Sequence, residues 1–214
     1  MNTECATGVC IKICGMTNFE DAVAATELGA NAIGFVFATS PRQVSPEKVR
    51  EIIGAMPLPV KTVGVFVNED PEKVASIASS CRLDLLQFHG EESVTYCRQF
   101  VQPVIKAVRV RSMEEVEECS AYSAVVDALL LDSHVPGQKG GTGRVFDWGL
   151  AVKAKRYGQI ILAGGLNPDN VAAAIHAVRP YAVDASSGLE YKPGLKDHSK
   201  MARFIQAVRR AEKL

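Results

Sequence analysis

The chain has 214 residues, of which 47% are hydrophobic, and its 24 basic and 24 acidic side chains give a formal net charge of zero. A balanced charge without a basic stripe argues against a nucleic-acid partner, and no apolar run approaches the ~20 residues that span a membrane. The N-terminal residues lack the pattern of a secretory signal, and the six cysteines show no metal-binding spacing. We therefore expect a cytoplasmic protein with reduced thiols.

Short apolar segments alternate with helical patterns along the whole chain. After a loose tail at 1–8, strands are predicted at 9–14, 32–37, 61–67, 83–88, 104–108, 124–131, 159–163 and 181–184. Helices are predicted from 17 or 18 to 28, at 46–55, from 70, at 91–100, from 112, from 147, at 168–178 and at 196–213. Ser45 and Asp70 each precede a proline and are typical N-caps, because their side chains accept free amide hydrogens of the first turn.

Eight strand–helix units share 214 residues, so each averages roughly 27 residues. The strands are apolar throughout, which is typical of strands buried on both faces, and strict alternation predicts a parallel sheet. We predict a single domain, 1–214, folded as a closed (β/α)8 or TIM barrel, a fold that needs at least ~200 residues. An open doubly wound sheet is disfavoured, because 14–18 (CGMTN) lacks the glycine fingerprint expected after its first strand.

Polar side chains stand at or just after the ends of several predicted strands. In a (β/α)8 barrel the carboxyl ends of all strands meet at one face, which carries the site. Seven residues should therefore converge there: Cys14, Arg42, Asn68, His89, Arg109, Asp132 and Asp184. A cysteine among apolar neighbours is more often core than catalytic, and an aspartate at a strand end often caps the next turn. From residue types alone, both interpretations stay open.

Small residues follow the last two predicted strands. Gly164 and Gly165 precede a helix start, and Ala185, Ser186 and Ser187 are expected to open a short helical turn. Exposed backbone amides and helix N-termini attract anions, so we predict that these loops bind a phosphate group. The alternative is that the glycines only allow tight turns.

A second glycine-rich loop at 137–143 includes Gly141. It lacks the Gly-Lys-Ser/Thr ending of a nucleotide-binding P-loop. We expect a flap that closes over the barrel mouth.

A set of motifs in order along nearly the whole chain resembles the phosphoribosylanthranilate isomerase family. They are 12–15 (KICG), 34–37 (GFVF), 40–42 (SPR), 63–67 (VGVFV), 86–90 (LQFHG), 131–132 (LD), 140–143 (GGTG), 146–148 (FDW), 163–166 (AGGL), 183–190 (VDASSGLE) and 194–197 (GLKD). The tail before Val9 departs from the family pattern, in which the first strand begins almost at the N-terminus.

The resemblance implies an Amadori rearrangement of N-(5-phosphoribosyl)anthranilate in tryptophan biosynthesis, without metal or cofactor. It places the general base on Cys14 and the general acid on Asp132. A base that acts near neutral pH needs a lowered thiol pKa, and an acid that stays protonated needs a raised carboxyl pKa. Arg42 suits the anthranilate carboxylate, because its planar fork binds carboxylates bidentately. Asp184 is expected to hold a substrate hydroxyl, to orient the phosphate loop or to cap its own turn.

Rival functions are a histidine-pathway aminoaldose isomerase, which would carry paired aspartates where this chain has Cys14, and a catalytically silent barrel that binds a phosphorylated ligand. We expect His89 to pack against the mouth. Lys12 points either into the barrel or toward a charged partner such as Asp184. The sequence leaves both a monomer and a homodimer open.

Overall fold

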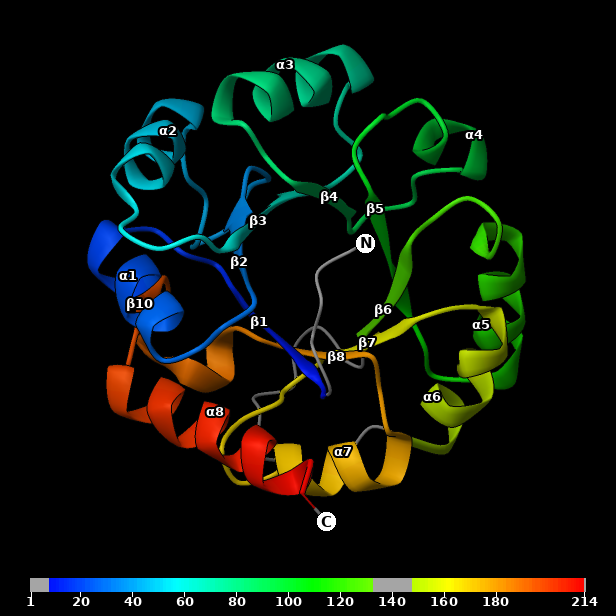
Figure 1. Cartoon of the computed structure of the whole chain (residues 1–214). Coiled ribbons are helices and arrows are strands. Elements are labelled where there is room, and N and C mark those ends of the chain that lie inside the picture. The colour runs from blue at the N-terminus through cyan, green and yellow to red at the C-terminus, as the bar shows by residue number, and fades with distance from the viewer. Residues whose placement is uncertain (1–7, 133–147, 214) are drawn as a thin grey trace.

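A computed structural model describes residues 8–132 and 148–213 of the chain. In these residues eight parallel strands close into a barrel in sequence order, and helices surround it (Figure 1). The strands are β1 Cys10–Cys14, β2 Ala32–Val36, β3 Lys61–Phe66, β4 Leu85–Phe88, β5 Val104–Arg109, β6 Ala128–Asp132, β7 Ile160–Leu162 and β8 Ala182–Ala185. The helices are α1 Phe19–Glu27, α2 Pro46–Ala55, α3 Pro71–Cys81, α4 Val94–Cys97, α5 Met113–Glu118, α6 Trp148–Ala154, α7 Val171–Val178 and α8 His198–Ala211. The predicted (β/α)8 barrel is confirmed.

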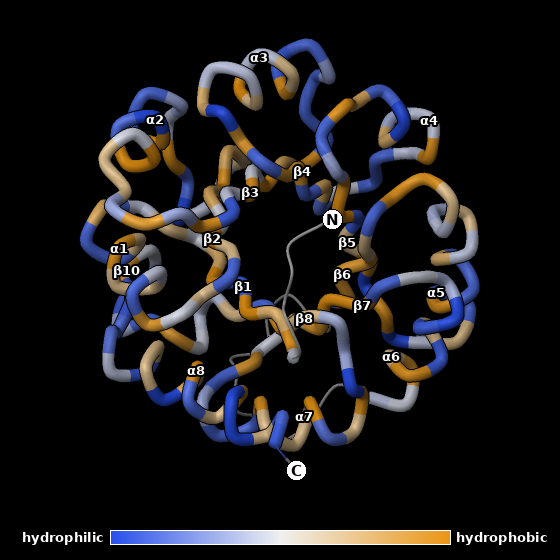
Figure 2. Tube along the Cα trace, viewed as in Figure 1, coloured by the Kyte–Doolittle hydropathy of each residue, from blue (hydrophilic) through white to orange (hydrophobic). Residues whose placement is uncertain are grey.

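Two apolar layers hold the barrel together. The larger core lies between strands and helices and contains the outward side chains of the strands, such as Ile11, Ile13 and Leu131. A smaller cluster fills the barrel interior, with residues such as Cys10, Ala32 and Leu130. In Figure 2 the strands are largely hydrophobic, whereas the helices of the outer ring carry both hydrophobic and hydrophilic residues. Because strand side chains alternate between faces, the side chains of β1 that point into the barrel are Cys10, Lys12 and Cys14, and the last two lie toward the mouth.

The predicted helix caps are present. The Ser45 side chain accepts a hydrogen bond from the Lys48 amide at the start of α2, and Asp70 accepts from the Glu72 and Lys73 amides at the start of α3. Each cap satisfies amides that have no partner within the first helical turn.

Two helices begin later than predicted, because side chains capture the backbone amides before them. Glu92 lies in a loop, where its carboxylate accepts hydrogen bonds from the amides of Asn68 and Gly90, so α4 is only the four residues Val94–Cys97. Before α7, the Asn170 side chain accepts from the Asn167 amide in a local turn. Such side-chain bonds compete with helical backbone bonds.

The segment between β8 and α8 is more elaborate than predicted. The expected helical turn is present as η3, Ser187–Leu189. An antiparallel pair then follows, β9 Glu190–Lys192 and β10 Leu195–Lys196, with Gly194 at φ +82° in its turn. This hairpin, which the apolar pattern did not indicate, brings Lys196 back to the barrel mouth.

Two further sequence predictions concern the membrane and the thiols. In residues 8–132 and 148–213 no helix combines the length and apolarity that crossing a membrane requires. Cys14, Cys81, Cys97 and Cys119 are free and buried. The prediction of reduced thiols is wrong for Cys10, which takes part in a disulfide.

Candidate active site

The proposed base and acid end two strands of the barrel. Cys14 is the last residue of β1 and Asp132 the last residue of β6, so the closed parallel barrel places both on the same rim. The Cys14 residue is 7% exposed, and its sulfur lies against Gly34 of β2, where an added Cβ would be 2.8 Å from Sγ. Gly34 therefore leaves the space that the thiol occupies.

Burial raises the pKa of the Cys14 thiol above its ordinary value. The cations of Lys12 and Lys196 lower this pKa, whereas the Asp184 carboxylate raises it, and burial outweighs both lysines. The expected lowering of the thiol pKa is therefore wrong. Charging the thiol inside the barrel costs more than the two cations offset.

Lys12 and Asp184 form an ion pair inside the barrel. The Lys12 Nζ donates to Asp184 Oδ1 over 3.0 Å, from neighbouring positions of β1 and β8. Burial opposes charging Lys12, but the charges of Asp184 and Cys14 outweigh it and raise the pKa of the ammonium. The two orientations predicted for Lys12 therefore coincide, since its side chain points into the barrel and pairs there with Asp184.

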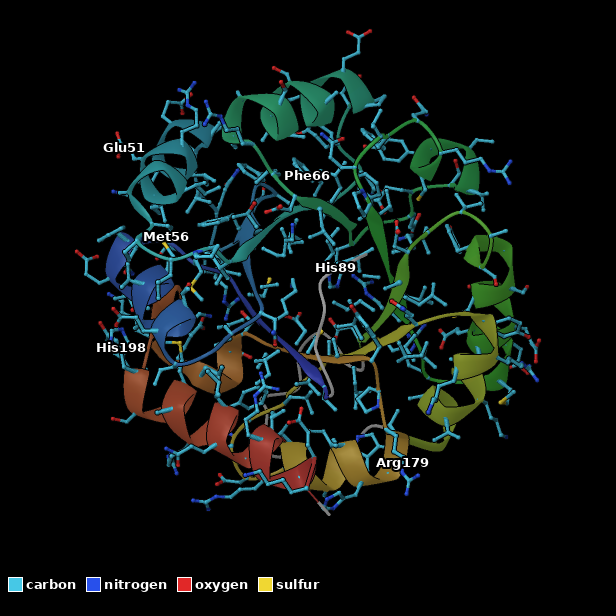
Figure 3. The ribbon with its side chains drawn as sticks, in the orientation of Figure 1. Glu51, Met56, Phe66, His89, Arg179 and His198 are labelled. Carbon is cyan, nitrogen blue, oxygen red and sulfur yellow. The ribbon has the colours of Figure 1, made fainter. Side chains whose placement is uncertain are left out.

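Asp132 contacts a histidine from a neighbouring loop. Its Oδ2 lies 3.3 Å from Nε2 of His89, which projects toward the centre of the ring in Figure 3. The Nδ1 of His89 is 3.1 Å from Nε2 of Gln87, the buried third residue of β4. His89 therefore lies at the mouth as predicted, and in addition it connects the β4 side of the rim to the proposed acid.

Arg42 reaches the mouth from the loop after β2. Its Nε and Nη2 each donate to a different oxygen of Glu190 over 2.7 Å, in a bidentate pair. Gly15 has φ +81°, and a Cβ added there would lie 2.6 Å from Cδ of Arg42 and 3.1 Å from Oγ of Ser186. The loops after β1, β2 and β8 therefore meet at Gly15.

The loops after β7 and β8 also touch each other. Gly164 and Gly165 adopt φ +83° and +75°, conformations that favour glycine. A Cβ on Gly188 would collide with the backbone oxygen of Leu166, so the two loops pack backbone against backbone. No described atom lies within 4 Å of a Cβ built on Gly165, which leaves room beside that amide.

The remaining site predictions fall into three groups. Ala185 is buried at the end of β8, and Ser186 and Ser187 lead into η3. Gly141 lies outside the described residues. In the described part of the chain, no cluster of three or more histidine, cysteine, aspartate or glutamate side chains could hold a metal ion.

Glu190, Lys196 and Gln87 were not predicted as site residues. All three fall inside the motifs at 183–190, 194–197 and 86–90. Their pairings could not be found from sequence, since Glu190 meets a residue 148 positions away. The sequence signal that could have identified Glu190 and Lys196 is the presence of a charged side chain within a family motif.

A family model described as N-(5'phosphoribosyl)anthranilate (PRA) isomerase matches residues 11–207. A relative of that name from Desulforudis audaxviator is 53% identical over 203 residues, covering 94% of this chain and 98% of the relative. Another from Pseudomonas fluorescens is 50% identical over 200 residues, covering 92% and 97%.

The chain is also similar to solved structures of such enzymes. The phosphoribosyl anthranilate isomerase of Thermotoga maritima matches with a TM-score of 0.88 and 45% identity, over 94% of this chain and 98% of that one. A phosphoribosyl anthranilate isomerase in complex with reduced 1-(o-carboxyphenylamino)-1-deoxyribulose 5-phosphate matches with a TM-score of 0.85 and 43% identity, over the same shares. A further Thermotoga maritima structure, with a TM-score of 0.84, 43% identity and the same coverage, is of monomers made from a dimeric enzyme. The chain belongs to the N-(5'-phosphoribosyl)anthranilate isomerase family.

Proposed function

We propose that Cys14 and Asp132 are the general base and general acid of the isomerisation catalysed by this family. The reaction converts N-(5'-phosphoribosyl)anthranilate to 1-(2-carboxyphenylamino)-1-deoxyribulose 5-phosphate in tryptophan biosynthesis. The observation that carries the proposal is the position of the two residues, which end β1 and β6 on one rim of the barrel.

The acid acts first. A proton from Asp132 reaches the ring oxygen of the ribose as the bond between that oxygen and C1 breaks. The lone pair of the anthranilate nitrogen forms the C1=N bond of a Schiff base. The substrate's own nitrogen thus accepts the positive charge, and His89 lies where it can orient the donating carboxyl.

The base acts second. The thiolate of Cys14 removes the proton from C2, and the electrons of that C–H bond form a C1=C2 bond while the C=N electrons return to nitrogen. The resulting enolamine tautomerises to the C2 ketone, so the net reaction moves hydrogens within the substrate. Positioned groups of this kind contribute ~10²–10⁴-fold each.

Binding is assigned to the loops around these two groups. Arg42 would hold the anthranilate carboxylate, and its side chain is 23% exposed. The phosphate group would bind the backbone amides of the last two loops, at Gly164, Gly165, Ala185, Ser186 and Ser187.

The remaining assignments concern Asp184, the location of the protein and its assembly. Asp184 would orient the phosphate loop that follows it. A cytoplasmic location is in keeping with the biosynthetic role of the family. A homodimer is the first assembly to test, because one Thermotoga maritima relative is described as dimeric.

One variant distinguishes the proposed isomerase from a catalytically silent barrel that binds a phosphorylated ligand. Asp132→Asn keeps the size of the side chain but cannot deliver a proton. We expect turnover of N-(5'-phosphoribosyl)anthranilate, followed by loss of its fluorescence, to fall by ~10²-fold or more, while the affinity for the reduced product analogue stays within a few-fold. Unchanged turnover would remove Asp132 as the acid, and a wild-type protein that binds the analogue without turnover would favour the silent barrel.

A further inference from the structure

A fully buried lysine joins three parts of the barrel mouth. The Nζ of Lys196, whose side chain is 0% exposed, donates to the backbone oxygen of Cys14 over 2.6 Å. It also donates to the backbone oxygen of Ser186 over 3.3 Å and to Oε1 of Glu190 over 2.9 Å. An ammonium has three N–H donors, and here each faces an acceptor. Lys196 thus anchors the carboxylate of Glu190 at a fixed place beside the end of β1.

Glu190 in turn fixes Arg42. Its Oε1 accepts from both Lys196 and the Nε of Arg42, and its Oε2 accepts from the Nη2 of Arg42. The Glu190 side chain is only 5% exposed, so water competes little for these bonds. The two cations hold the pKa of the Glu190 carboxyl below its usual range, although burial alone would raise it.

This arrangement decides which edge of Arg42 can meet a ligand. The Nε–Nη2 edge is occupied by Glu190, and the stem of Arg42 lies against Gly15, where a Cβ would be 2.6 Å from Cδ. A guanidinium has a second bidentate edge, formed by its two terminal nitrogens. That edge is the one left for a second carboxylate.

We propose that Glu190, anchored by Lys196, is a positioning residue that aims the terminal edge of Arg42 at the anthranilate carboxylate. The inference rests on the proposed role of Arg42 in binding that carboxylate. A stabilising role alone is a weaker explanation, because buried ion pairs contribute little net stability compared with apolar side chains of similar volume.

The test compares two ligands that differ only in the carboxylate. One is reduced 1-(o-carboxyphenylamino)-1-deoxyribulose 5-phosphate, and the other is the same molecule with a plain phenyl ring. In Glu190→Gln the amide group must face a donor of Arg42 or Lys196, so the bidentate pair is broken while the volume is kept. We expect its affinity for the first ligand to fall by about 10- to 100-fold and its affinity for the second to change by less than about threefold.

Arg42→Ala and the double variant tell the two proposals apart. If Arg42→Ala lowers the affinity for both ligands equally, or for neither, Arg42 does not bind the carboxylate and the proposed function fails at that residue. If Arg42→Ala discriminates between the ligands and Glu190→Gln does not, the positioning role alone is overturned. Support requires that Arg42→Ala with Glu190→Gln loses no more discrimination than Arg42→Ala alone.

A matched control breaks an ion pair at the other end of the barrel. Asp84 pairs with Lys61 over 2.9 Å, and the two residues lie at the amino ends of β4 and β3. Asp84→Asn should lower thermal stability without discriminating between the ligands. If this control also loses affinity selectively for the ligand with the carboxylate, general destabilisation of the barrel, and not the orientation of Arg42, explains the result for Glu190→Gln.

Discussion

Lys12 and Asp184 form an ion pair of 3.0 Å inside the barrel, between side chains that are 4% and 9% exposed. The pair lies next to the proposed base, since an added Cβ on Gly34 would contact both Cys14 Sγ and Lys12 Nζ. Burial is the largest cause of the raised pKa of the Cys14 thiol, and the Asp184 carboxylate adds to it by opposing the effect of Lys12.

Activity should therefore rise with pH. Cys14 would act as a base in its thiolate form, and because burial raises the pKa of this thiol, the thiolate is a minor species at neutral pH. Each pH unit below that pKa should lower the single-turnover rate by about tenfold. The measurement is the rate between pH 6 and 9, together with the rate of iodoacetamide alkylation, with Cys14→Ser as the unreactive control. Wild-type turnover in Cys14→Ser would contradict the role of Cys14 as the base.

Gly34→Ala should slow the reaction by displacing the thiol. The added Cβ would lie 2.8 Å from Sγ and 3.3 Å from Cα of Cys14, closer than carbon and sulfur tolerate. We expect kcat to fall by about tenfold or more with a smaller change in KM, because the displaced group acts in the chemical step.

A second glycine provides the control for this variant. Gly54 lies in α2, and no described atom is within 4 Å of its built Cβ. Gly54→Ala should leave kcat unchanged and raise stability by about 0.5–1 kcal/mol, since alanine is the better helix former. Equal kcat in both variants would mean that the space at Gly34 does not matter for the thiol.

His89→Ala should reduce kcat by misorienting the acid. The His89 Nε2 is 3.3 Å from Oδ2 of Asp132, and Gln87 fixes the other ring nitrogen. We expect about a 10- to 100-fold loss of kcat with analogue affinity kept, as for loss of a positioned group.

The control is a second histidine–aspartate pair, whose histidine side chain is 51% exposed. His198 contacts Asp21 over 2.8 Å at the start of α8, on the outer ring in Figure 3. His198→Ala should leave kcat within about twofold of wild type. If His89→Ala also retains full activity, the orienting role is wrong.

Lys106→Met should destabilise the fold strongly. Lys106 Nζ donates to Glu92 Oε2 over 3.0 Å and to the Gly90 oxygen over 2.7 Å, and the two side chains are 4% and 1% exposed. Removing the lysine leaves Glu92 buried without its cation, at a cost of about 3–5 kcal/mol in unfolding free energy. Urea denaturation at neutral pH measures the change.

An exposed pair gives the comparison for this stability test. Lys73 and Glu69 lie 2.7 Å apart with side chains 61% and 27% exposed. Lys73→Met should change the unfolding free energy by no more than about 1 kcal/mol, because water screens the pair. Similar losses in Lys73→Met and Lys106→Met would contradict the argument from burial.

The sequence by itself determined the architecture and the rim. Apolar strands, caps such as Ser45 and Asp70, and strict alternation are local signals, because each depends on residues a few positions apart. Once eight units imply a closed barrel, topology alone places Cys14 and Asp132 on one face. The family motifs then supplied roles for both.

Only the tertiary structure decided which side chains pair at the rim and how their charges affect one another. The pairs Lys12–Asp184 and Arg42–Glu190 join residues 172 and 148 positions apart, and the hairpin that returns Lys196 has no apolar pattern of its own. The tertiary structure also decided the direction in which the pKa of Cys14 shifts, because burial and nearby charges depend on distances in space and not along the chain. Coulomb energy and desolvation depend on distances in three dimensions, and closure of the barrel sets those distances.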